Sequence, residues 1–141
     1  MSAFWQAWFQ FWLVSMVVFA LAVAGGALPA TEAPFRLGLM LVNGGVPVEL
    51  DPALRFVTGI LGGVFLGWIV LMALVLRQAA TLGAAGRPLW QAATIGMLTW
   101  YMLDSTLSVL TGFALNVVPN SLALVTFLIG IAGSGVLVRR A

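Results

Sequence analysis

The chain has 141 residues, of which 62% are hydrophobic and only 7% are charged, and its formal net charge is +2. Soluble domains contain about 25% charged residues, so this composition excludes an ordinary soluble domain and predicts a membrane protein. The absence of cysteine and histidine excludes disulfides, thiol catalysis and the usual zinc, iron–sulfur and haem ligands. Scattered arginines form no basic patch, so nucleic-acid binding is not expected.

Long uncharged stretches predict four transmembrane helices. Four runs contain no charged residue, namely 1–31, 56–76, 88–103 and 105–138. Runs of 18 or more apolar residues are candidate membrane spans, and the last run is interrupted by Asn116-Val-Val-Pro-Asn120. We therefore expect an all-α polytopic protein with one transmembrane domain, a four-helix up-and-down bundle with helices at about 8–28, 53–77, 89–115 and 120–138.

The N-terminus places six aromatic residues between Phe4 and Trp12. Aromatic rings with a polar edge concentrate at membrane interfaces, so residues 3–12 are predicted to form an interfacial turn that leads into the first helix. That helix has a face of small residues, Ala20, Ala24 and Ala27. A cleaved signal peptide is disfavoured because no lysine or arginine precedes the apolar run.

Residues 29–52 are predicted to form an extramembrane loop with an apolar middle. This middle part is either a short interfacial helix, from Pro34 to the pair Asn43-Gly44, or a hairpin that turns at the same pair. In both cases its apolar character indicates that it caps the bundle or docks on a neighbour.

Three glycines in the second predicted helix, Gly59, Gly63 and Gly67, follow each other at four-residue steps. Such a stripe lets another helix backbone approach closely, which matters in lipid because hydrophobic burial does not drive helix association there. The partner is either another helix of this chain or a second protein.

The arginines predict the orientation and the compartment. Arginine is the chain's only basic side chain, and its abundance with Ala, Gly, Leu and Val is typical of a GC-rich bacterial genome. If both termini are cytoplasmic, Arg36 and Arg55 lie outside, and the inner side carries Arg77, Arg87, Arg139 and Arg140. The positive-inside rule therefore predicts a multi-pass bacterial inner-membrane protein with its N-terminus and C-terminus in the cytoplasm.

Asp104 is the only charged residue deep inside an apolar segment. A charge at the centre of a bilayer costs at least about 2.5 to 3.5 kcal/mol, so the side chain should point into the bundle. Helical spacing places other side chains on the same face, namely Met97, Trp100 or Tyr101, Ser108, Thr111 and Leu115.

Three interpretations of Asp104 remain open. The first is structural: Asp104 either accepts hydrogen bonds from its own helix face or pairs with an arginine, for which Arg55 is the natural partner, and so fixes how the helices pack. The second is a proton or ion path, although such a path needs several groups in series. The third is recognition of a lipophilic molecule such as a quinone, carotenoid or lipid. In this case the polar contacts would come from Tyr101, Asp104, Ser105 and Ser108, and the apolar walls from Trp68, Trp100 and Phe113.

No enzyme and no metal site are expected. The serines lack a base, Asp104 lacks a second carboxylate, and the glycines lack the lysine of a phosphate-binding loop.

The stretch Leu50-Asp-Pro-Ala-Leu-Arg-Phe-Val-Thr-Gly-Ile-Leu-Gly-Gly63 resembles a pattern in small four-helix bacterial membrane proteins of the DoxX-like and BphX-like families. The resemblance implies a four-helix fold. It also implies that Asp51, Pro52, Arg55 and Gly59 are helix-start and packing positions.

Together these features predict a non-catalytic accessory or structural subunit of a larger bacterial membrane complex, such as an energy-converting one. Its partners would be other integral membrane subunits and membrane lipid. The alternative is a binder or carrier of a lipophilic small molecule.

Overall fold

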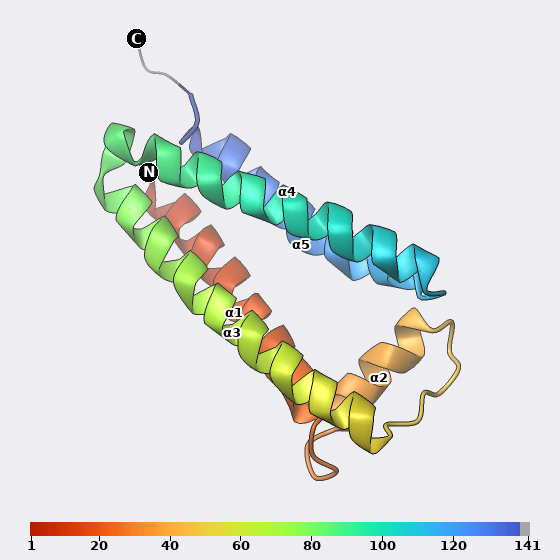
Figure 1. Ribbon diagram of the computed structural model, residues 1–141. Coiled ribbons are helices and arrows are strands. Elements are labelled where there is room, and N and C mark those ends of the chain that lie inside the picture. Colours follow the sequence, from red (N-terminus) through yellow and green to blue (C-terminus); the bar gives the residue numbers. More distant parts are fainter. Residues whose placement is uncertain (139–141) are drawn as a thin grey trace.

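The computed structural model describes residues 1–138, and this part of the chain is helical without any strand. The predicted all-α class is therefore confirmed. Arg139 and Arg140, on which the predicted orientation partly depends, lie outside the described residues. In chain order the elements are α1 (Ala3–Gly25), α2 (Ala33–Val42), α3 (Pro52–Thr81), the 3-10 turn η1 (Gly83–Gly86), α4 (Arg87–Leu110), the 3-10 turn η2 (Ala114–Asn116) and α5 (Val117–Ser134) (Figure 1).

Three segments are long and apolar enough to cross a membrane, namely α1, α3 and the stretch Ala114–Ser134 that contains α5. This finding indicates a membrane protein. The helix α4 is 24 residues long, but it carries Asp104 and several hydroxyl side chains and is not one of the three. The predicted fourth span is therefore not confirmed.

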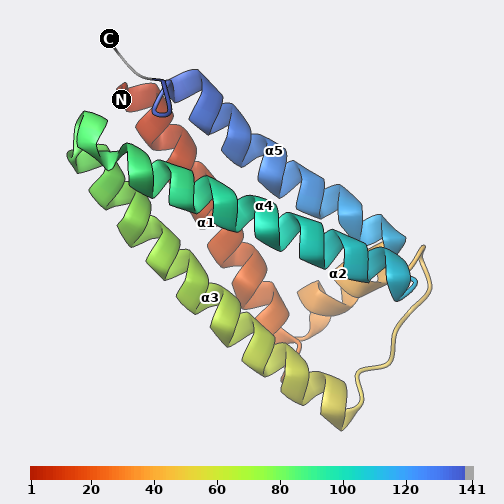
Figure 2. The same ribbon diagram turned by 45° about the horizontal axis from the view of Figure 1, so that its top comes forward.

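The long helices form two neighbouring pairs, α1 with α3 and α4 with α5 (Figures 1 and 2). The pairs converge at the end that holds the N-terminus and η1, and they diverge toward the opposite end. The short helix α2 lies at this diverging end, which we call the open end.

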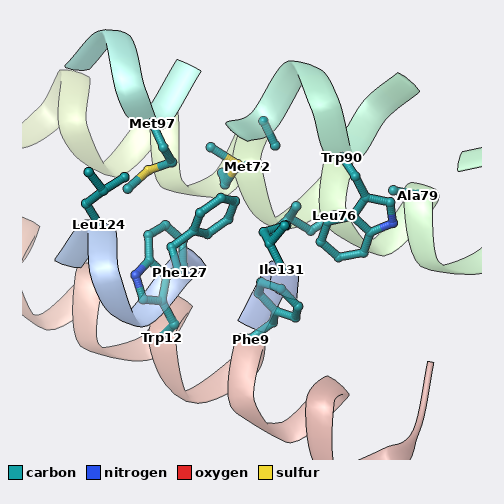
Figure 3. Packing of buried hydrophobic residues seen from close by; sticks show 11 residues of the cluster. Phe9, Trp12, Met72, Leu76, Ala79, Trp90, Met97, Leu124, Phe127 and Ile131 are labelled. Carbon is teal, nitrogen blue, oxygen red and sulfur yellow. The ribbon is translucent and has the colours of Figure 1, made fainter. Parts of the chain in front are cut away.

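The apolar core fills the converging end with aromatic and long aliphatic side chains (Figure 3). The buried rings of Phe9 and Trp12 on α1 pack against Phe127 on α5, with centroids 5.9 and 5.1 Å from it. The indole N–H of Trp12 donates to the carbonyl of Ala123 at 2.9 Å. Residues 3–12, predicted to form an interfacial turn, are part of the regular helix α1. On a helix, Phe9 and Trp12 lie three residues apart and so share the face that meets α5.

Small residues bring α1 and α3 into close contact. A Cβ atom added to the buried Gly62 would overlap the backbone of Ala24, and one added to Gly59 would lie 3.2 Å from the Cβ of Ala27. The predicted small-residue face of α1 thus meets α3.

Two of the three predicted stripe glycines do not take part in this contact. Gly63 and Gly67 are exposed, and an added Cβ at either would meet open space. Gly62 makes the contact with α1 instead. Residues 59 and 62 point toward α1, whereas residues 63 and 67 are rotated away from it.

The helix ends differ from the predicted ones by a few residues. The helix α4 ends at Leu110 and is followed by Gly112 with φ +90°, so the turn comes before Asn116. Pro119 lies in the first turn of α5, where its missing N–H breaks no helical hydrogen bond. Similarly, α1 begins at Ala3 and α3 continues to Thr81.

The short helix predicted for this loop is confirmed, and the hairpin is not formed. Pro34 lies at the start of α2, Asn43 caps its end, and Gly44 follows with φ +68°. This left-handed conformation is one that glycine adopts at low cost after a helix.

Candidate functional site: a polar cluster beside an apolar cavity

Asp104 is held by two asparagines. The side-chain amide of Asn120 donates to its Oδ2 atom at 2.6 Å, and the amide of Asn116 donates to the same atom at 3.5 Å. The two amides also donate to serine hydroxyls on α4, Asn116 to Ser108 at 2.9 Å and Asn120 to Ser105 at 3.3 Å. These five side chains, which we call the Asp104 cluster, join α4 to η2 and α5.

Local structure explains the cluster. Asp104 and Ser108 are one helical turn apart on α4, and Asn116 and Asn120 are four residues apart across η2 and the start of α5. The short turn after Leu110 makes α4 and α5 antiparallel neighbours, so the two rows of side chains face each other. Sequence reasoning treated the asparagines as turn residues and missed their role, although their four-residue spacing next to a buried acid is a usable signal.

The predicted ion pair between Asp104 and Arg55 is not formed. Arg55 Nη2 lies 2.5 Å from Glu32 Oε2, and Arg36 Nη1 lies 2.9 Å from Glu32 Oε1. Glu32 directly precedes α2 and Arg55 lies in the first turn of α3, so the two charged groups meet at the open end. Hydrogen bonds from Arg36 and from Arg55 hold the pKa of Glu32 below its usual value.

A cavity of about 410 Å³ lies beside the Asp104 cluster, at the open end between the two helix pairs. Its polar wall contains Asp104, Ser108, Asn116 and Asn120, and none of the arginines within residues 1–138 lines it. Its remaining walls are mainly apolar and include five aromatic residues, Phe19, Phe35, Phe65, Trp100 and Phe113.

A second cavity of about 520 Å³, lined almost entirely by apolar residues, lies between α1, α2 and the start of α5. Both cavities are lined by Phe35, Leu39 and Val42 of α2. The helix α2 therefore forms part of the wall of each.

The structure brings together only part of the predicted ligand-binding set. Trp100, Asp104, Ser108 and Phe113 line the 410 Å³ cavity, whereas Ser105 is buried in the Asp104 cluster. Tyr101 instead shares a hydrogen bond of 3.1 Å with Ser121.

Two further predicted residues do not line this cavity. The ring of Trp68 stacks on Phe65, which lines the cavity, with centroids 5.4 Å apart. Met97, which shares the predicted face of Asp104, is buried in the apolar core at the converging end.

Comparison with known proteins gives no match to any family model, any curated protein or any solved structure. The resemblance to the DoxX-like and BphX-like families therefore stays a prediction. Within residues 1–138, no group of three or more acidic side chains lies close enough to hold a metal ion. What the site offers chemically is one carboxylate and its amide partners in the wall of an otherwise apolar cavity.

Proposed function

We propose that the protein binds a lipophilic small molecule, such as a quinone, carotenoid or lipid, in the cavity beside the Asp104 cluster. The observation that carries the proposal is the 410 Å³ space with a single polar wall. Ligand sites are typically concave, mainly apolar and about 300 to 1,000 Å³, with a few polar groups that orient the ligand.

We also propose that α4 crosses the membrane, so that the chain has four spans. Its 24 residues would extend about 36 Å at 1.5 Å per residue, and the hydrocarbon core is about 30 Å thick. Hydrogen bonds within the Asp104 cluster reduce the cost of burying this helix. In a bacterial inner membrane with both termini cytoplasmic, the open end and α2 face outward.

The test compares three proteins purified in a gentle detergent, whose organic extracts are analysed by mass spectrometry. Val42 lines both cavities, so Val42→Trp should fill space and reduce the co-purified compound at least about fivefold. Leu37→Trp adds the same ring on the exposed side of α2 and should retain the wild-type amount. Extracts without any stoichiometric compound, or equal amounts in all three proteins, would contradict the proposal.

A second candidate is a non-catalytic accessory subunit that packs against other integral membrane subunits of a larger complex. The observation in its favour is the outward position of Gly63 and Gly67 on α3, where another helix could approach closely. It predicts that gentle extraction yields the chain together with other subunits, and that Gly63→Leu weakens their association. Wild-type protein free of associated chains would contradict it.

A further inference from the structure

The amide donors of the Asp104 cluster are occupied. An asparagine amide nitrogen carries two hydrogens, and those of Asn116 and Asn120 each have two acceptors within the cluster. An amide oxygen facing the carboxylate would be repelled, which fixes the orientation of both amides. In the part of the chain that the structure describes, no hydrogen bond reaches Asp104 Oδ1. Apart from the Ser108 hydroxyl, the polar wall therefore presents acceptors to the cavity.

The charge of the cavity wall has one sign. Among residues 1–138, Asp104 is the only charged residue that lines it. Arg55, the cation that the sequence suggested as its partner, is paired with Glu32. A charge beside mainly apolar walls acts more strongly than one in water, so the wall favours a positive group and disfavours a negative one.

Aromatic rings complete the arrangement. Trp100 and Phe113 line the same cavity as Asp104, and Trp100 belongs to a row of rings with Trp68 and Phe65. Ring faces attract organic cations, and this attraction increases when water is excluded.

We infer that the ligand is a hydrophobic organic cation, a lipophilic amine or quaternary ammonium compound. The inference rests on the proposed function and narrows its ligand class. A carotenoid hydrocarbon would make no use of the carboxylate, a neutral quinone would gain no comparable attraction from that charge, and an anionic lipid would be repelled.

The test uses two ions of nearly equal size and shape and opposite charge, tetraphenylphosphonium and tetraphenylborate. Their affinities are measured for wild type, Asp104→Asn and Glu49→Gln in a nonionic detergent, and each variant is compared with wild type so that partition into micelles cancels. Glu49 is an exposed carboxylate outside the cavity, so its variant controls for general charge attraction. We expect Asp104→Asn to weaken phosphonium binding at least about tenfold and borate binding not at all, and Glu49→Gln to change neither.

A measurement on wild-type protein covers the case in which Asp104→Asn does not fold. Dodecyltrimethylammonium should displace bound phosphonium at lower concentration than dodecanol, which has the same chain without the charge. Equal displacement by both, equal losses for both ions in Asp104→Asn, or no phosphonium binding would overturn the inference. A neutral decyl-quinone that binds wild type but not Val42→Trp, without cation binding, would overturn the cation and leave the proposed function standing.

Discussion

At the residue scale, Asn120 is the main partner of the Asp104 carboxylate. It donates the 2.6 Å hydrogen bond to Asp104 and is itself buried. A charged group in an apolar setting is tolerated when neighbouring dipoles are fixed toward it, and here an amide does what a basic residue would otherwise do.

Replacement of Asn120 by alanine should therefore lower the free energy of unfolding by about 1.5 to 3 kcal/mol, the range for a hydrogen bond to a charged group. The measurement is reversible denaturation in detergent. A double-mutant cycle with Asp104→Asn should show a coupling of at least about 0.5 kcal/mol, because the two side chains touch.

The matched control is the cycle of Asp104→Asn with Arg55→Gln. These effects should add to within about 0.5 kcal/mol, because Arg55 is paired with Glu32. Strong coupling between Asp104 and Arg55 would contradict the pairing of Arg55 with Glu32.

At the element scale, two adjacent glycines on α3 have opposite surroundings. Gly62 faces the backbone of Ala24, and Gly63 faces open space. Gly62→Val should separate α1 from α3 and cost about 1 to 3 kcal/mol, as overpacking usually does, whereas Gly63→Val should be near neutral. Thermal unfolding of both variants is the measurement, and similar melting temperatures would argue against this helix contact.

The attachment of α2 depends on Glu32. Its lowered pKa means that the ion pairs stabilise the folded state above the usual value of 4.5, and that this contribution is lost as the pH falls through the lowered value. At pH 7, Glu32→Gln should therefore speed hydrogen exchange of the α2 amides relative to wild type. The difference should shrink as the pH falls from about 4.5 through the lowered pKa of Glu32, because the folded wild-type carboxyl loses its charge there.

Arg36→Gln removes one of the two ion pairs and should have a smaller effect on exchange. Exchange of α2 that is unchanged in both variants would show that apolar contacts alone hold this helix.

Much of the helical layout could be predicted from the sequence, since uncharged runs and proline and glycine positions mark helices directly. The partners of Asp104 could not. The sequence suggests Arg55 as the outer cation for the buried acid, but it does not show that Glu32, in the turn before α2, pairs with Arg55 instead. Likewise, the four-residue glycine spacing identifies a small-residue stripe without showing which side of α3 meets α1.

At the scale of the whole molecule, divergence of the two helix pairs leaves the cavities at the open end, and the core holds the other end together.

The proposed topology makes the open end extracytoplasmic. Because the chain has no cysteine, single cysteines at Val46, Ala84 and Ala114 can report this in intact cells. An impermeant thiol reagent should label Val46→Cys and Ala114→Cys but not Ala84→Cys. If Ala84→Cys and Ala114→Cys behave alike and differ from Val46→Cys, both ends of α4 lie on the same side and α4 does not cross the membrane.

Native mass spectrometry of the protein gently extracted from its own membrane tests most directly whether it binds a lipophilic molecule, because it reports bound molecules and associated chains together. We expect one or two copies of the chain, each with one small lipophilic adduct that Val42→Trp loses and Leu37→Trp keeps. A mass that contains other subunits and no adduct would contradict the ligand-binding function and establish an accessory subunit.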